Sequence, residues 1–177
     1  MGKIVFCKSY YYLMNQEFVI QSDQGDEYRL RITSDHIGML SEDVLRELAN
    51  KGVQVVDIEL ERTKGDNVTS PRVLAKIEEC IADIFLSHQD VMICFFCDFI
   101  SLIPSSKKNM SVQEYRSRLF SNMFERYVNG HHIVGISNQV VTVKGIAEDY
   151  FAHVIVREEH VYLAKIIGEG IQKDFGK

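Results

Sequence analysis

The fold of this chain depends most on one apolar stretch, Val91-Met92-Ile93-Cys94-Phe95-Phe96-Cys97. An unbroken apolar run leaves no side of a strand to turn toward water, so it predicts a strand that is buried on both faces. Such a strand belongs in the middle of a sheet, where helices or other layers cover it. We therefore expect the sheet to form around residues 91–97.

The segment after this strand predicts a helix with arginines inside its apolar side. Ser111 is expected to cap the helix, with the side chain of Glu114 reaching back to the cap. At about 100° per residue, one side of the helix carries a set of apolar and aromatic residues: Val112, Tyr115, Leu119, Phe120, Met123, Phe124 and Tyr127. Arg116 falls near the centre of this side and Arg126 near its edge. A buried guanidinium needs carboxylate or carbonyl partners, and Asp98 is the nearest candidate in the sequence.

The rest of the chain predicts strands in adjacent pairs as well as strands between helices. Residues 16–23 and 27–33 form a predicted hairpin, and an alternating pattern over residues 53–62 predicts another strand. Further helices are expected to begin at Ser41 and at Ser70-Pro71, where serine caps and proline takes the first helical position. Three short strands over 132–136, 139–144 and 150–157 and a helix over 159–175 complete the chain.

These elements predict one globular domain over residues 1–177. Its fold class is expected to be α+β, because paired strands alternate with helices less regularly than in a doubly wound protein. We expect a largely antiparallel or mixed sheet, with about four helices packed mainly on one face.

Composition excludes several classes of protein. With 46% hydrophobic and 25% charged residues, the chain has ordinary globular usage. It contains no apolar run of the roughly 18 residues that a membrane helix needs, and the short apolar stretch at its beginning leads us to expect no secretory signal. A net charge of −5 weighs against broad binding of nucleic acid, although Lys107, Lys108 and Arg118 leave a local basic patch as a third possibility. We therefore expect a cytoplasmic protein with no membrane partner and no nucleic-acid partner.

The cysteines and histidines do not define a cofactor site. The four cysteines, Cys7, Cys80, Cys94 and Cys97, are expected to be reduced thiols. Cys94 and Cys97 have the C-x-x-C spacing, but residues three apart on a strand point to opposite faces, so neither a disulfide nor one metal ion joins them.

A metal site built from His132, His153 and His160 would depend entirely on strand pairing. No nucleotide-binding or hydrolase fingerprint occurs in the sequence. We therefore expect no cofactor and no bound metal.

Asp57, Glu59 and Glu61 share one face of the strand predicted over residues 53–62. Such an acidic face can be half of the site of a metal-dependent nuclease or hydrolase. It can equally be a solvated charge ladder, with Arg29 and Arg31 on a neighbouring strand as partners. The ladder is favoured, because the lysine that such nucleases usually place in a Glu-x-Lys pattern is here Glu61.

Three features of the middle third of the chain carry a resemblance. Ser70-Pro71-Arg72 opens an Ile-rich helix, Cys97-Asp98 ends the apolar strand, and Arg116-x-Arg118-Leu119-Phe120 precedes Phe124 and Tyr127. In these features the chain resembles an uncharacterised family of small proteins from the Bacteroidetes, a domain of unknown function. The resemblance implies a bacterial cytoplasmic setting and supplies no catalytic residue.

These observations lead to two hypotheses of function. The first is a non-enzymatic protein-interaction or regulatory module, with a protein partner or self-association into a homodimer, because tyrosines such as those of the Tyr10-Tyr11-Tyr12 segment suit interfaces. The alternative is a metal-dependent hydrolase or nuclease acting on an anionic substrate. In that enzyme Arg116 and Arg126 would bind the anion, and Asp98 or the acidic face would hold the metal. Asp98 and Arg116 are also candidates for a buried ion pair that only stabilises the fold.

Overall fold

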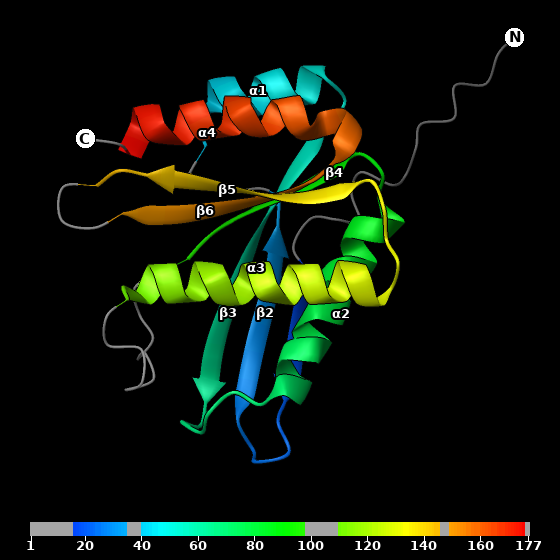
Figure 1. Cartoon of the computed structure of the whole chain (residues 1–177), viewed down its shortest axis with the longest axis vertical. Helices are drawn as coiled ribbons and strands as arrows, with labels where there is room; N and C mark the ends of the chain where they lie inside the picture. The colour runs from blue at the N-terminus through cyan, green and yellow to red at the C-terminus, as the bar shows by residue number, and fades with distance from the viewer. Residues whose placement is uncertain (1–15, 35–39, 98–109, 146–148, 176–177) are drawn as a thin grey trace, which may run out of the picture.

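The computed structural model describes residues 16–34, 40–97, 110–145 and 149–175. Within these residues, strands form a single six-stranded sheet with helices packed on it (Figure 1). The elements follow in the order β1 (Gln16–Gln21), β2 (Glu27–Thr33), α1 (Glu42–Asn50), β3 (Gln54–Lys64), α2 (Pro71–Ser87), β4 (Val91–Phe96), α3 (Val112–Gly130), β5 (Ile136–Val143), β6 (Tyr150–Arg157) and α4 (Val161–Phe175). A short 3-10 helix, Glu158–His160, leads into α4.

The sheet has the strand order β1-β2-β3-β4-β6-β5. The pair β3–β4 is parallel and is connected through α2, whereas the other four neighbouring pairs are antiparallel. Residues Val91 to Phe95 of β4 are all buried, and β4 lies between β3 and β6. The structure thus confirms the central apolar strand and the predicted α+β class with a mixed sheet.

Helices cover both faces of the sheet, which differs from the prediction that they pack mainly on one. One core cluster joins α2 and α3 to side chains such as Val56, Ile93 and Ile155. A second cluster, on the opposite face, joins α1 and α4 to side chains such as Met92 and Val154. The physical reason is that β4 and β6 carry apolar residues at consecutive positions, so side chains on both faces of these strands must be buried by packing against helices.

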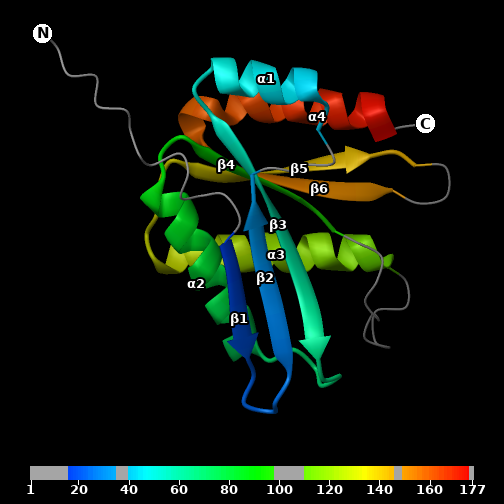
Figure 2. The same cartoon turned by 180° about the vertical axis from the view of Figure 1, so that it is seen from behind.

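The cover on the α1 and α4 side is partial. Figure 2 shows β1, β2 and most of β3 in front of α2 and α3, with α1 and α4 lying above them over the other part of the sheet. One face of β1, β2 and β3 therefore carries charged side chains that water reaches, among them Glu17, Arg29 and Glu61.

The predicted helix caps are present at two helices. The hydroxyl oxygen of Ser70 accepts a hydrogen bond from the backbone N–H of Val73 at 3.3 Å, and that of Ser111 accepts one from Glu114 at 3.1 Å. Oε1 of Glu114 accepts a hydrogen bond from Nη2 of Arg118 at 2.7 Å, whereas the capping-box prediction has the Glu114 side chain reaching back to the cap.

The three short strands predicted after α3 are two in the structure, β5 and β6. Residues 131–135 form a turn instead of a strand, in which His132 has a φ of 53° and Gly135 a φ of 76°. Positive φ angles at these two positions are incompatible with an extended chain, so β5 begins only at Ile136.

Candidate functional site

The arginines singled out by the sequence lie in two different surroundings. Arg116 is partly buried on α3 beside the thiol of Cys97, and burial lowers the pKa of its guanidinium. Arg126 lies about 15 Å further along α3 at 1.5 Å per residue, and its Nη2 is 2.6 Å from Oε1 of Glu78 on α2. Asp98 lies outside the described residues, so its pairing with Arg116 stays a prediction.

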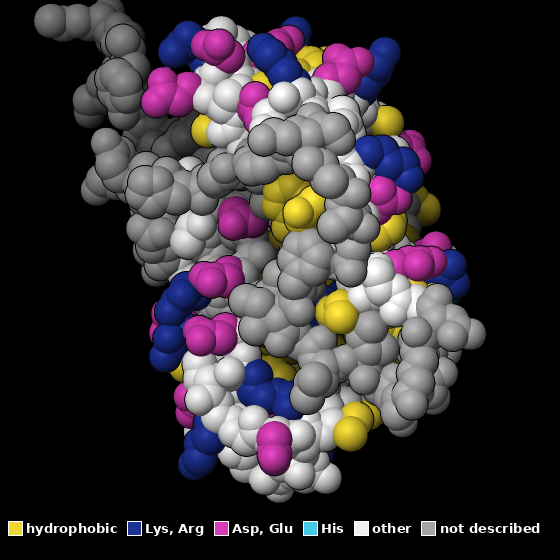
Figure 3. Space-filling view, turned by 90° about the vertical axis from the view of Figure 1, so that its left-hand side faces the viewer, with side chains coloured by type: hydrophobic (Ala, Val, Ile, Leu, Met, Phe, Trp, Pro, Cys, Tyr) yellow, Lys and Arg dark blue, Asp and Glu magenta, His cyan; other side chains and the backbone are white. Residues whose placement is uncertain are grey.

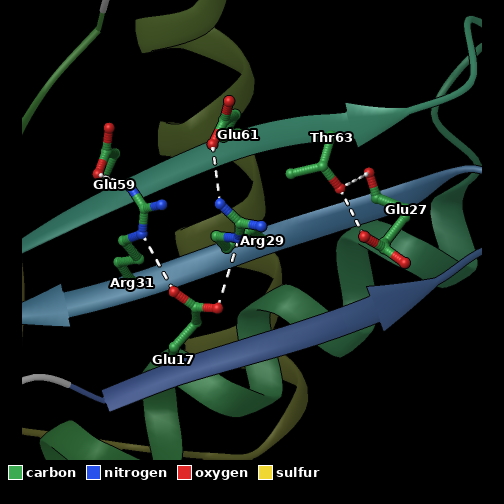
Figure 4. Close-up of polar contacts among 7 residues, drawn as sticks. All are labelled: Glu17, Glu27, Arg29, Arg31, Glu59, Glu61 and Thr63. Atoms are coloured by element: carbon green, nitrogen blue, oxygen red, sulfur yellow. Dashed lines mark hydrogen bonds and ion pairs between the residues drawn. The ribbon is translucent and has the colours of Figure 1, made fainter.

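The acidic face of β3 is largely occupied by arginines of β2 (Figure 4). Arg31 contacts Glu59 at 3.0 Å and Glu17 at 3.2 Å. Arg29 contacts Glu17 at 3.4 Å and Glu61 at 3.8 Å. The arrangement is the charge ladder that the sequence analysis favoured over a metal site.

Asp57 differs from the other two acidic residues of this face. Burial raises the pKa of its carboxyl to about 6, and the charge of Glu59 acts in the same direction. Asp57 faces Cys94 of β4 in the register of the parallel pair. Within the residues that the structure describes, no three histidine, cysteine or acidic side chains are placed to hold a metal ion.

The cysteines behave as core residues. Cys94 and Cys97 belong to the clusters on opposite faces of the sheet, as predicted, and Cys80, Cys94 and Cys97 form no disulfide with a described residue. Burial raises the pKa of all three thiols, to about 11 for Cys97. Cys7 lies outside the described residues.

Of the predicted basic patch, only Arg118 lies within the described residues. Arg118 is tied to Glu114 on its own helix, and Lys107 and Lys108 lie outside the described residues. On the face seen in Figure 3, the Lys and Arg side chains drawn in dark blue lie among Asp and Glu side chains drawn in magenta.

A polar cluster connects α3 to β5 and β6. It consists of the buried Ser117 and His153 and the half-buried Ser121 and Asn138. The side chain of His153 is 0% exposed, with its Nδ1 3.0 Å from Oδ1 of Asn138 and its Nε2 3.0 Å from Oγ of Ser117. Because an amide oxygen only accepts, Nδ1 carries the proton and Nε2 accepts from the serine hydroxyl. The Nδ2 group of Asn138 donates to Ser121 at 3.3 Å, which fixes the orientation of the amide.

This order of groups is that of a serine nucleophile, a histidine base and an orienting amide. Its surroundings point to a structural role. The ring of His153 stacks on Phe95 at 5.0 Å and meets the edge of Phe120 at 5.0 Å, and Ser117 is only 6% exposed. Burial lowers the pKa of His153 to about 4, whereas a general base works best with a pKa near the working pH. We therefore assign the polar cluster to the attachment of α3.

Gln113 lies one helical turn before Ser117 and is 0% exposed. Neither its Oε1 nor its Nε2 has a hydrogen-bond partner among the described residues. A buried polar group left without a partner costs about 1–3 kcal/mol.

A pocket, called here the α2–α3 pocket, lies between α2 and α3 next to the polar cluster. Its cavity volume is about 60 Å³. It is lined almost entirely by apolar side chains of the two helices, the turn after α3, β5 and β6: Glu78, Ile81, Ala82, Phe85, Leu86, Phe120, Met123, Phe124, Tyr127, Val128, Ile133, Ile136 and Ile155. The ion pair of Glu78 with Arg126 bridges the two helices at this site, and His131 stacks on Tyr127 at 4.1 Å.

Sequence reasoning identified several wall residues of this pocket as the apolar side of α3 but did not find the pocket or the polar cluster. The spacing of Gln113, Ser117 and Ser121, four residues apart, was the available signal for a polar row on one side of the helix. The sequence indicates His153 only as a metal ligand with His132 and His160. In the structure His153 is buried under α3, whereas His132 is exposed in the turn after it.

No protein-family model, no curated protein and no solved structure significantly matches this chain. The geometry alone defines its class: an α+β domain with a mixed six-stranded sheet and an apolar pocket between two helices of one face. None of the helices in the described part of the chain is long and apolar enough to cross a membrane.

Proposed function

We propose that this protein is a non-enzymatic interaction module that binds a protein partner through the α2–α3 pocket. The observation that carries this proposal is an apolar cavity between two surface helices, with Leu86 exposed beside it. Covering apolar surface is favourable by about 25 cal/mol per Å², so a partner that fills the cavity gains free energy. The bacterial cytoplasmic setting implied by the resemblance belongs to the same proposal.

The size of the cavity favours an aliphatic side chain of the partner. A volume of about 60 Å³ is less than half of the roughly 150 Å³ in which an apolar protein cavity holds a benzene ring. This space fits the branched end of valine or leucine better than an aromatic ring. Burial of such a side chain contributes about 1.5–3 kcal/mol, the usual size of a central interface contact.

The alternative, a metal-dependent hydrolase or nuclease acting on an anionic substrate, has less support. The carboxylates of Glu59 and Glu61 are bound by arginines, and Arg126 is bound by Glu78. These side chains would have to leave their partners before they could bind a metal ion or a substrate anion.

A titration with N-acetyl-leucinamide, followed by the amide chemical shifts of the ¹⁵N-labelled protein, tests the proposal. We expect saturable shift changes at residues that line the pocket, such as Ala82, Phe120 and Met123, with a dissociation constant of about 10 mM for a gain of about 2.7 kcal/mol. Ala82→Leu should fill the cavity and abolish these changes. Ala75→Leu, on the same side of α2 but outside the pocket lining, should leave them intact.

Circular dichroism of both variants shows whether the helices are retained. The proposal is wrong if the shifts of the pocket residues do not respond to the probe. It is equally wrong if Ala82→Leu binds the probe as well as the original protein does.

A further inference from the structure

We infer that the partner carries a lysine or arginine next to the aliphatic side chain that enters the α2–α3 pocket. This inference rests on the proposed function and adds the chemical class of the partner. It derives from the charge of the α2 surface at the pocket mouth, where the aliphatic side chain would enter.

The second half of α2 is acidic. From Glu78 to Ser87 the helix carries Glu78, Glu79 and Asp83 and contains no lysine or arginine. Glu78 lines the pocket, and at about 100° per residue Glu79 and Asp83 follow on the solvent side of the helix. The apolar hollow is therefore bordered by carboxylates along one helix.

Only one of these carboxylates is neutralised by a cation in the described part of the chain. The side chain of Glu78 is 10% exposed and binds Arg126, which is itself 60% exposed. Glu79 and Asp83 are exposed and form no ion pair with any described residue. Lys76 is the nearest lysine along α2, but it lies one turn before Glu79 and outside the pocket lining.

These carboxylates lie close enough to the pocket to act on one of its wall residues. The pKa of Tyr127, a wall residue on α3, is raised by burial and then by the charges of Asp83, Glu79 and Glu78. The pKa of Cys80 on α2 is raised by burial and by Asp83 and Glu79. Groups on two helices thus experience the same carboxylates.

A cationic neighbour of the inserted side chain complements these negative charges. Each exposed ion pair that forms at the rim should improve affinity by about two- to fivefold. A second copy of this chain that docked pocket to pocket would instead bring two sets of the same carboxylates together, which repulsion disfavours. We therefore place a basic partner segment on the pocket.

Three acetylated and amidated peptides, GSKLKSG, GSQLQSG and GSELESG, test the inference by amide chemical-shift titration of the full-length protein. They present the same leucine with cationic, neutral or anionic neighbours. We expect the lysine peptide to bind about fivefold or more tightly than the glutamine peptide and the glutamate peptide to bind most weakly. The advantage of lysine should shrink between about 20 mM and about 200 mM salt, because the rim is exposed.

The double variant Glu79→Gln with Asp83→Asn should remove the advantage of lysine and leave the affinity for the glutamine peptide unchanged. The matched control, Glu42→Gln with Asp43→Asn on α1, removes two carboxylates from the opposite side of the sheet and should change nothing.

Equal affinities for the three peptides at the pocket, or tighter binding of the glutamate peptide, would overturn the inference while leaving the proposed function intact. If no peptide shifts the pocket residues, the proposed function is refuted as well.

Discussion

The buried imidazole of His153 makes the stability of this protein depend on pH. Burial lowers the pKa of His153 from 6.5 to about 4, so the folded protein holds the ring neutral while the unfolded chain takes up a proton. The unfolded state therefore binds more protons between these values, and stability is lost as the pH falls through this window. A gap of about 2.5 pH units at about 1.36 kcal/mol each amounts to about 3.4 kcal/mol.

Asp57 acts in the opposite direction over nearly the same window. Burial raises its pKa from 3.8 to about 6, so the folded protein favours the protonated carboxyl. The stabilisation is fully present below 3.8 and is lost as the pH rises through about 6, a difference of about 3 kcal/mol. In the unmodified protein the contributions of His153 and Asp57 to the pH dependence of stability nearly cancel. Substituting either residue should therefore expose the pH dependence that the other one causes.

Urea unfolding at about pH 7, 6, 5 and 4 measures both effects. In His153→Gln, the new amide can still donate to Asn138 and accept from Ser117. As the pH falls from about 7 to about 4, the free energy of unfolding of this variant should rise by about 3 kcal/mol relative to that of the original protein. Asp57→Asn should lose about 3 kcal/mol over the same range relative to the original protein. Parallel pH profiles for the three proteins would refute the assignment of the two buried groups.

Three further predictions concern side chains elsewhere in the fold. Gln113→Met should raise the free energy of unfolding by about 1–3 kcal/mol, because it removes a buried amide without a partner. Gln139→Met, which removes a hydrogen-bonded amide, is the control. If Gln113→Met does not raise the free energy of unfolding, Gln113 is not a buried amide without a partner. Glu17→Gln should destabilise slightly at low salt and not at all at high salt, since its carboxylate joins two exposed arginines; thermal unfolding that is insensitive to salt would count against this. The thiols of Cys94 and Cys97 should react with Ellman's reagent only after unfolding in urea, because both are buried and have raised pKa values; rapid labelling of the folded protein would show that they are accessible.

The sequence predicted much of the fold because its signals were local. The apolar run over residues 91–97 gave the central strand, and Ser70 and Ser111 marked two helix starts. The prediction placed helices mainly on one face. Consecutive apolar residues such as Met92 and Ile93 nevertheless require that both faces of the strand be buried. Placing helices on both faces depended on the pairing of β4 with β6, which no local pattern contains.

The candidate site was harder to predict because the buried side of α3 is not its most apolar side. Periodicity placed Arg116 near the centre of the buried side, whereas the structure buries Gln113 and Ser117 completely or nearly so. Ser117 is buried because His153 lies opposite it on β6 and offers a hydrogen bond. A partner supplied by a distant strand can be recognised only when the sheet order is known. The pairing of Asp98 with Arg116 stays a prediction, because Asp98 lies outside the described residues.

The parallel pair β3–β4 has a consequence for the order in which the chain folds. The hairpins β1–β2 and β5–β6 can form from neighbouring residues, but the parallel pair joins residues 54 and 91 only after α2 has crossed between them. The pairing of β3 with β4 joins the part of the sheet that precedes α2 in the chain to the part that follows α2. The α2–α3 pocket takes one wall from α2 and the others from α3, β5 and β6, so it forms only when α2 has packed against the segment that follows β4. A chain in which α2 has not yet packed would lack the pocket that we propose as the binding site, so binding of the proposed partner would depend on that packing.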